Sequence, residues 1–136
     1  MPLNDFIIIY IIYIRSYLEQ SCVVWHSALT KENSENLERV QKIALRIILK
    51  EKYENYEVAL KITKLKTLAE RREKLCLKFA SNCIKNPKTA SMFPPNNVST
   101  VDTRDKDPYH VQTATTERLK RSAIPYMQRL LNKNKT

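Results

Sequence analysis

The sequence predicts an all-α fold, a small bundle of about four helices with an irregular C-terminal extension. The 136 residues include no glycine, the residue on which tight hairpins between β-strands usually depend. A hydrophobic content of 43% is enough to bury a core in one small domain. Several segments carry apolar residues at helical spacing. Absence of hairpin turns and presence of helical periodicity therefore favour helices throughout.

The first predicted helix spans residues 5–25. Its apolar run, residues 6–14, is rich in Ile and Tyr, which favour strands. The apolar pattern nevertheless continues to Trp25, which is too far for one ordinary strand. A helix that is apolar on every side is normally covered by neighbours, so we expect this one to need a partner that a small domain does not supply.

A second helix is predicted over residues 32–49, after a polar gap in which Thr30 or Ser34 caps it. Its expected inner face is Leu37, Val40, Ala44, Ile47 and Ile48. Roughly opposite lies a basic face of Arg39, Lys42, Arg46 and Lys50. A short third helix over residues 54–62 would bury Tyr56, Ala59, Leu60 and Ile62.

The fourth predicted helix spans residues 68–85. Thr67 and Glu70 have the spacing of a capping box, and Pro87 follows the helix end. The expected inner face is Leu68, Leu75, Cys76, Phe79, Ala80 and Cys83. The expected outward stripe is basic and consists of Arg71, Lys74, Lys78 and Lys85.

The sequence divides into three predicted regions. Residues 1–92 form a helical domain, residues 93–114 a polar linker without apolar periodicity, and residues 115–136 a short C-terminal helical segment. Because proline breaks a helix interior, we expect Pro125 to separate two short helices in the last region.

The charge of the chain indicates an anionic partner. There are 24 Lys and Arg against 14 Asp and Glu, a net charge of +10. Nucleic acid and an acidic membrane surface both fit. A solvated surface with local pairs such as Glu38–Lys42 is the alternative that charge alone leaves open. Without glycine, the chain cannot form phosphate-cradling loops or a nucleophile elbow.

Cysteine usage and the N-terminal run indicate a cytoplasmic or nuclear protein that is not secreted. The three cysteines are scattered and imply no disulfide framework. The unbroken apolar run of nine residues is shorter than the about 20 residues of a membrane span, so no transmembrane span is expected. Cys22 and His26 would make only half a zinc site. We expect no metal and no cofactor.

Five strings carry a resemblance to a known family. Residues 13–19 read Tyr-Ile-Arg-Ser-Tyr-Leu-Glu, residues 24–27 read Val-Trp-His-Ser, and residues 37–42 read Leu-Glu-Arg-Val-Gln-Lys. The fourth string consists of Leu65, Leu68, residues 70–72 and Leu75. The fifth, near the C-terminus, consists of Arg118, Ser122, residues 124–126 and residues 130–132. In this order and spacing the strings resemble the region after the catalytic palm in reverse transcriptases of non-LTR retrotransposons.

The resemblance implies a helical thumb, which in that family grips the template–primer duplex. In this family the catalytic aspartates lie in the palm, as a Tyr-x-Asp-Asp turn plus another aspartate. Here Asp5, Asp102, Asp105 and Asp107 are isolated, so we expect no catalytic residues and no polymerase activity. The palm would be a missing partner. The resemblance also implies side chains that bind the sugar–phosphate backbone of RNA or DNA, and we expect these to be Arg39, Lys42, Arg46, Lys50, Arg71, Lys74 and Lys78.

A competing hypothesis uses the N-terminal apolar helix. The chain would then be a small helical interaction protein that docks a partner or a membrane surface. If one flank of this helix faces water, self-association through Phe6, Ile8 and Ile12 is expected.

Overall fold

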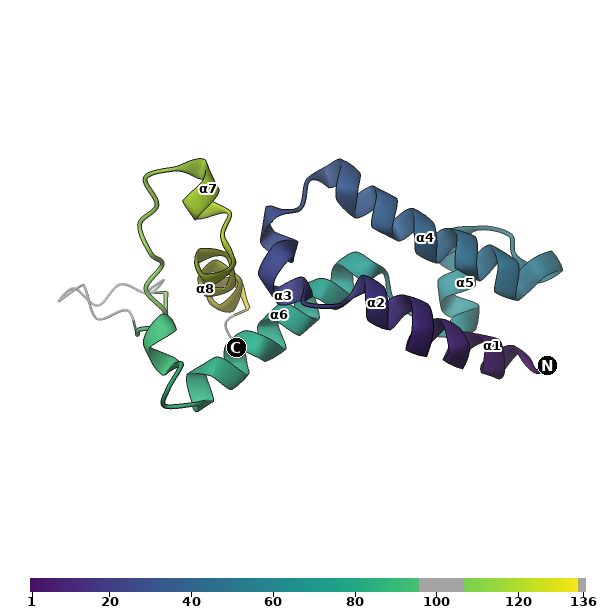
Figure 1. The fold of residues 1–136 in the computed structure, drawn as a ribbon, viewed down its shortest axis with the longest axis horizontal. Coiled ribbons are helices and arrows are strands. Elements are labelled where there is room, and N and C mark those ends of the chain that lie inside the picture. The colour runs from purple at the N-terminus through teal and green to yellow at the C-terminus, as the bar shows by residue number, and fades with distance from the viewer. Residues whose placement is uncertain (96–106, 135–136) are drawn as a thin grey trace. The chain divides into compact units, whose positions relative to one another are not determined.

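The computed structural model describes residues 1–95 and 107–134 and is all-α, as predicted (Figure 1). Within the described residues there is no β-strand, and the one isolated bridge pairs Pro95 with Tyr109. The chain forms two compact units. Unit 1 comprises Met1–Cys22 and Leu29–Glu73; unit 2 comprises Val23–Ala28 and Lys74–Thr136, as far as it is described.

Unit 1 begins with a continuous helical stretch. It consists of α1 (Leu3–Ile9), a π-helical turn (Tyr10–Arg15) and α2 (Ser16–Leu18). The helix prediction for the Ile- and Tyr-rich run is therefore confirmed. Its predicted continuation to residue 25 is wrong, because the chain turns at Ser21, whose φ is 53°. A separate short helix, α3 (Cys22–Trp25), and a 3₁₀ turn (His26–Ala28) follow.

The long helix of unit 1 is α4 (Lys31–Leu49), which runs alongside α1 in Figure 1. Thr30 is its N-cap, and the Thr30 hydroxyl accepts a hydrogen bond from the Asn33 N–H at 3.2 Å. This confirms one of the two predicted caps. A 3₁₀ turn, Lys50–Lys52, ends α4.

Two further helices follow the predicted ranges closely. Helix α5 (Tyr56–Thr63) is capped by Asn55, whose side chain accepts from the Val58 N–H at 2.9 Å. Helix α6 (Leu68–Lys85) has the predicted bounds, and the Thr67 hydroxyl accepts from the Glu70 N–H at 3.2 Å. Residues 68–73 of α6 belong to unit 1 and residues 74–85 to unit 2.

The core of unit 1 lies between α4 and α5. Leu45 and Leu49 of α4 are buried there with Ala59 of α5, and partly buried side chains surround them. The predicted inner face of α4 is wrong at Val40 and Ile47, which are exposed. The helix is rotated so that Gln41 and Leu45 face inward, because a buried polar network uses Gln41. Ile62 of α5 and Phe79 of α6, also predicted inside, are exposed as well.

Unit 2 packs the second part of α6 against α8 (Ala123–Lys133), with the short helix α7 (Glu117–Lys120) before it. Its core consists of Cys76, Ala80, Cys83, Phe93, Met127 and Leu130. Pro125 does not separate the two C-terminal helices, so that prediction is wrong. The break falls at residues 121–122, and Pro125 lies in the first turn of α8, where no N–H has an intrahelical acceptor.

The described part of the predicted linker is irregular. Residues 107–114 lie against α8, where Asn132 exchanges two hydrogen bonds of 3.0 Å with the Tyr109 backbone. Gln128 accepts from the Gln112 N–H at 2.9 Å and donates to the Met92 carbonyl at 2.8 Å. Residues 96–106 of the linker lie outside the described residues. The two compact units interleave along the chain. They do not test the predicted division into residues 1–92, 93–114 and 115–136, which stays a prediction.

Candidate nucleic-acid interface

Three of the seven predicted site residues, Arg39, Lys42 and Arg46, lie on α4 from its middle onward, and a fourth, Lys50, begins the 3₁₀ turn that follows the helix. Arg39, Lys42, Arg46 and Lys50 are all exposed. Residues 39–50 contain no acidic residue, and Glu38, the acid that precedes them, takes part in an interior network described below. The C-terminal half of this helix therefore presents a cationic surface, which we call the α4 cationic ridge.

Two cations of the α4 cationic ridge are held over aromatic rings. The Lys42 ammonium lies 5.1 Å from the ring centroid of Tyr56, and the Arg46 guanidinium carbon lies 5.4 Å from that of Tyr53. Both distances are within the range of cation–π attraction. The contacts restrict two long side chains, so less conformational entropy is lost when these side chains bind an anion.

An exposed apolar row lies beside the cations. Val40, Ile43 and Ile47 occur at helical spacing on α4 and are exposed. The outer face of α4 therefore combines positive charge, which suits contact with phosphates, with exposed apolar surface, which is typical of a contact with a protein or a membrane.

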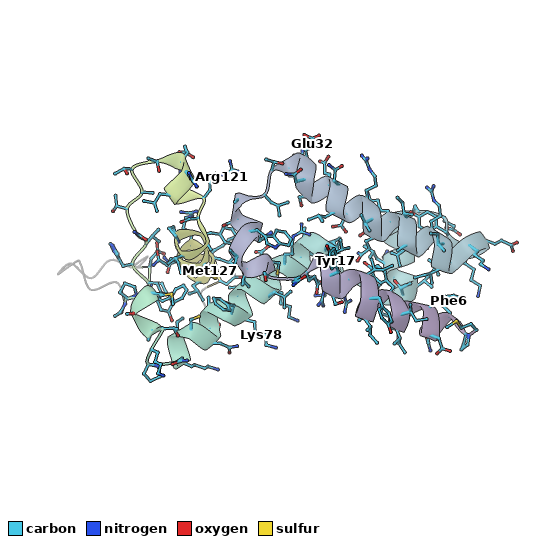
Figure 2. All side chains as sticks on the ribbon, in the orientation of Figure 1. Phe6, Tyr17, Glu32, Lys78, Arg121 and Met127 are labelled. Carbon is cyan, nitrogen blue, oxygen red and sulfur yellow. The ribbon has the colours of Figure 1, made fainter. Side chains whose placement is uncertain are left out.

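The three predicted residues of α6 have different environments. Arg71 donates to Glu19 through Nη2 at 2.9 Å and through Nε, and its side chain is 30% exposed. The hydrogen bond to Glu19 raises the pKa of Arg71 further. Lys74 and Lys78 are exposed and belong to unit 2 (Figure 2 labels Lys78). The ion pair thus makes Arg71 a bridge within unit 1 rather than an outward cation.

Gln41 is the centre of a buried polar network that the sequence did not reveal. The side chain is 0% exposed. Its Oε1 accepts from the Tyr10 hydroxyl at 2.6 Å. Its Nε2 donates to the Tyr56 hydroxyl at 2.8 Å and to the Lys66 carbonyl at 3.0 Å. One amide therefore joins α4 to the N-terminal helix, to α5 and to the turn before α6.

Glu38 extends this network to the start of α6. Its carboxylate accepts from the Tyr56 hydroxyl and from the Leu68 N–H, the latter at 3.1 Å to Oε2. A carboxylate at this place neutralises the positive end of the α6 dipole. Along residues 37–42, Glu38 and Gln41 hold the fold while Arg39 and Lys42 face outward, so one short string serves both roles.

The phenols of Tyr10 and Tyr56 and the thiol of Cys22 stay protonated. Burial raises the pKa of Tyr10, and burial together with the hydrogen bond to Glu38 raises that of Tyr56. Both phenols therefore act as donors. Burial also raises the pKa of the Cys22 thiol. No disulfide joins the three cysteines, and all three are buried, which is the environment of inert, structural thiols.

The described residues hold no group of three or more His, Cys, Asp or Glu that could bind a metal ion. His26 instead packs edge-on against Tyr126, with ring centroids 5.5 Å apart. Of the four aspartates, Asp102 and Asp105 lie outside the described residues. No single described helix is long and apolar enough to span a membrane; Leu3–Leu18 and Cys22–Ala28, bent at their break, reach that length and composition only as a pair.

Comparisons with known proteins add no relative. Neither models of protein families, nor curated proteins, nor solved structures match the chain.

Proposed function

We propose that this chain is a thumb-like region of a non-LTR retrotransposon reverse transcriptase and binds the nucleic-acid backbone without reading sequence. The observation that carries the binding proposal is the α4 cationic ridge: four exposed cations, two held over tyrosine rings, and no acid among residues 39–50. Among the predicted cations of α6, we include the exposed Lys74 and Lys78 as further residues that bind phosphate. Arg71 is left out because Glu19 already engages it.

The ridge would act through phosphate neutralisation. Each Lys or Arg that contacts a phosphate releases condensed counterions, so affinity falls steeply as salt rises. Contacts to phosphates fix position but carry no sequence information. The buried Gln41 and Glu38 contacts would keep α4 rigid, so that the cations are presented at fixed spacing.

The proposed role excludes catalysis by this chain alone. Polymerase chemistry needs carboxylates that hold two metal ions, and in the proposed parent these belong to a palm that is not among these 136 residues. Pure protein with a primed template, nucleotides and magnesium or manganese is expected to add no nucleotide. Robust primer extension would overturn the assignment.

Charge reversal tests the binding surface. R39E/K42E/R46E is compared with K31E/K52E/K61E, which makes the same charge change at three exposed lysines of the same unit. We expect the ridge variant to weaken binding of a labelled RNA–DNA duplex at least tenfold more than the control does, equally for unrelated sequences. Equal losses in both variants, or binding that is independent of salt, would remove the ridge from the proposal.

A second candidate function rests on the N-terminal helices. Ile8, Ile12, Tyr13 and Tyr17 are exposed on α1, the π-helical turn and α2, and Figure 2 labels Phe6 and Tyr17 along this stretch. A small helical interaction protein would use such a face to dock a protein partner or a membrane surface. I12K/Y17K would then abolish docking and leave nucleic-acid affinity unchanged, which separates the two functions.

A further inference from the structure

The outer face of α4 carries an apolar row that the binding of phosphates does not use. Val40, Ile43 and Ile47 are all exposed, and the exposed fractions of the two isoleucines are 53% and 67%. The three residues occur at positions i, i+3 and i+7, so their side chains form one stripe along about two turns of the helix. We call these three residues the α4 apolar row.

The α4 apolar row adjoins the α4 cationic ridge along its length. Each of Arg39, Lys42 and Arg46 directly precedes a residue of the row in the sequence. Arg39 and Ile43 are four residues apart, and Ile43 and Arg46 are three apart, and residues at these separations are neighbours on a helix surface. The positive charge therefore lies on one flank of the row, and residues 39–50 contain no acid that would neutralise it.

Both parts of this face are restricted before any partner binds. On the cationic flank, Lys42 lies over the ring of Tyr56 and Arg46 lies over the ring of Tyr53. The α4 apolar row consists of β-branched residues, whose χ1 angle is already restricted in a helix. Little side-chain freedom is left to lose when a partner packs here, which favours docking.

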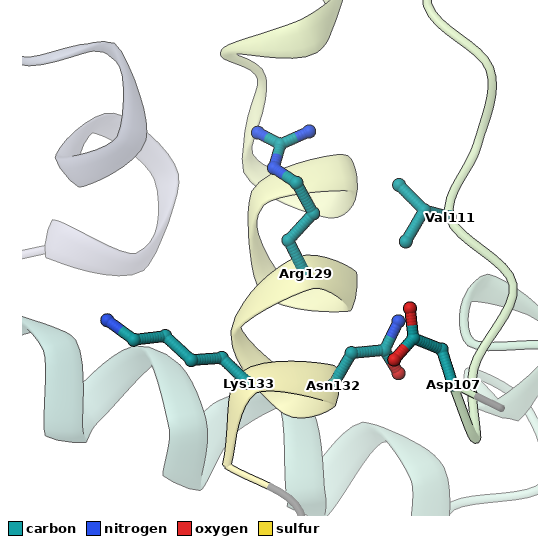
Figure 3. A pocket seen from close by; sticks show the side chains of 5 residues that line it. All are labelled: Asp107, Val111, Arg129, Asn132 and Lys133. Atoms are coloured by element: carbon teal, nitrogen blue, oxygen red, sulfur yellow. The ribbon is translucent and has the colours of Figure 1, made fainter. Parts of the chain in front are cut away.

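The cations of unit 2 offer no comparable face. Figure 3 shows the hollow beside α8, where Lys133 points away from Arg129. Arg129 donates to the Lys120 carbonyl at 2.6 Å, and the Lys120 ammonium is paired with Glu117 at 3.8 Å. Among the described residues from 107 onward there is no exposed large hydrophobic side chain. Positive charge and exposed apolar surface therefore coincide on α4 but not at this hollow.

We propose that this face of α4 docks a helix of a partner protein whose apolar stripe packs on the α4 apolar row and whose Asp or Glu side chains pair with the α4 cationic ridge. Amphipathic helices are recognised through anchors at the i, i+3, i+4 and i+7 spacing that the row also has. Charge complementarity makes the partner acidic, because like charges across an interface are costly. This docking goes beyond the proposed function, since a docked helix would cover the ridge and exclude nucleic acid from it.

A second copy of the chain fits this face less well than an acidic helix. If it docked through its own α4, it would bring four further exposed cations, Arg39, Lys42, Arg46 and Lys50, against only two exposed acids of that helix, Glu32 and Glu35. The net positive charge at the interface would then increase, which opposes association.

An anionic membrane surface also fits less well. A flat surface would contact α4 along its length, and the first half of the helix, residues 31–38, contains three Glu and one Lys. Glu32, labelled in Figure 2, and Glu35 are exposed, and anionic lipids would repel both carboxylates. The α4 apolar row also has no aromatic residue of the kind that interfacial helices insert. A partner helix, in contrast, can be confined to residues 39–50.

The test uses the full chain and a synthetic peptide as the probe. The peptide has about 18 residues, enough to form a helix, with leucines along one stripe and glutamates on both flanks of that stripe. One control peptide has the same composition with the leucines dispersed around the helix, and a second has lysines in place of the glutamates. We expect the acidic amphipathic peptide to bind roughly tenfold more tightly than either control, measured by fluorescence anisotropy.

Substitutions on α4 identify the surface that the peptide uses. I43Q/I47Q is compared with I8Q/I12Q, which makes the same change at two exposed isoleucines of the same unit. We expect I43Q/I47Q to weaken peptide binding roughly tenfold and I8Q/I12Q to change it less than about twofold. R39E/K42E/R46E should weaken it more than K31E/K52E/K61E does. Because all these positions are exposed, the far-UV circular dichroism of each variant should match the wild type.

Binding of an RNA–DNA duplex to the same proteins separates this docking from the proposed function. The acidic peptide should displace the duplex from the wild type, and I43Q/I47Q should keep its duplex affinity. Peptide binding without duplex binding would support the docking face even if the nucleic-acid proposal fails. An equal loss of peptide and duplex affinity in I43Q/I47Q would assign the row to the nucleic-acid site and overturn the docking proposal.

Two further outcomes would overturn the docking proposal and leave the nucleic-acid proposal standing. In the first, the wild type does not distinguish the acidic peptide from its controls, or I43Q/I47Q and I8Q/I12Q bind it equally. In the second, phosphatidylserine vesicles bind the wild type but not I43Q/I47Q, and the peptide does not bind, which would assign this face of α4 to a membrane surface.

Discussion

At the scale of the residue, Gln41 has the largest structural consequence. Its amide satisfies the Tyr10 hydroxyl and the Lys66 carbonyl, and it donates to the Tyr56 hydroxyl, while the side chain itself is fully buried. Buried polar groups are expensive when they lose their partners. The stability of unit 1 should therefore depend on this side chain more than on any exposed residue of α4.

Replacing Gln41 tests this dependence. Q41L keeps a similar volume but leaves the Tyr10 hydroxyl and the Lys66 carbonyl without the amide. The free energy of unfolding should fall by about 1–3 kcal/mol. R39A, at an exposed position of the same helix, should change it by less than about 0.5 kcal/mol. Urea unfolding followed by circular dichroism measures both, and equal small effects would show that the network contributes little.

Tyr10, which is buried, and Tyr56, which is partly buried, predict a loss of stability at alkaline pH. Burial raises the pKa of Tyr10 and Tyr56 in the folded chain, whereas an unfolded tyrosine titrates near about 10. As pH rises past about 10, the unfolded chain releases protons that the folded chain keeps. Stability is therefore fully present below this pH and falls above it.

Thermal unfolding between neutral pH and about pH 11 measures this effect. Y10F/Y56F should flatten the alkaline decline, although the double variant also loses hydrogen bonds and starts from a lower stability. Y13F/Y17F, at two exposed tyrosines, should keep the wild-type decline. If both double variants decline with the same slope, the buried phenols are not the cause.

Residue roles were only partly predictable from the sequence. Thr30 and Thr67 were found because a hydroxyl before a helical pattern satisfies local N–H groups. The helical spacing groups Arg71 with the outward cations, yet Arg71 pairs with Glu19. The neighbouring Arg72 is 1% exposed and donates to Ser34. Those partners are distant in sequence, and spacing along one helix does not indicate them.

At the scale of the element, three of the described residues have a positive φ, which glycine usually adopts, although each carries a Cβ. Ser21, Lys50 and Lys64 all have positive φ, a conformation that costs a residue with a Cβ roughly 1–2 kcal/mol. Lys64 follows the last turn of α5, and its N–H closes that helix on Leu60 and Lys61. Because no Gly or Pro marks these turns, the end of the first helix near Ser21 was not predictable.

Substitution by glycine is expected to change the stability of the chain in opposite directions at Lys64 and at Lys61. K64G removes the Cβ from a left-handed position and should stabilise the chain by about 1 kcal/mol. K61G, inside α5 and also exposed, should destabilise it by about 0.5–1 kcal/mol. Urea unfolding of the two variants checks this. Destabilisation by both would mean that Lys64 is not left-handed in solution.

At the scale of the whole molecule, fold class was predictable and unit organisation was not. Helical periodicity and the lack of glycine indicated an all-α chain, and the bounds of α6 agree with the prediction. The assignment of α3 and the second part of α6 to a unit with α8 depends on contacts between distant segments.

The exposed N-terminal face predicts how the whole chain behaves in solution. Ile8 and Ile12 are 51% and 55% exposed, and Phe6, Ile9, Tyr13 and Tyr17 are exposed around them. We call these exposed side chains the N-terminal apolar patch, and exposed apolar patches are typical of surfaces that associate. Burial of this patch against a second copy is favourable at about 25 cal/mol per Å². We therefore expect the isolated protein to self-associate through residues 6–14.

I8K/I12K should reduce this association while the helical signal in far-UV circular dichroism is kept, because both side chains already face water. I7K/I11K is the matched control: these neighbours are partly buried, so their replacement should unfold the N-terminal helix instead. Sedimentation velocity across a concentration series measures the association. A wild-type chain that stays monomeric at the highest concentration, or an I8K/I12K variant that unfolds, would mean that the face is covered by the protein itself. The physical reason to expect a partner at this face would then be lost, and the reverse-transcriptase assignment would depend on the sequence strings and the cationic surfaces alone.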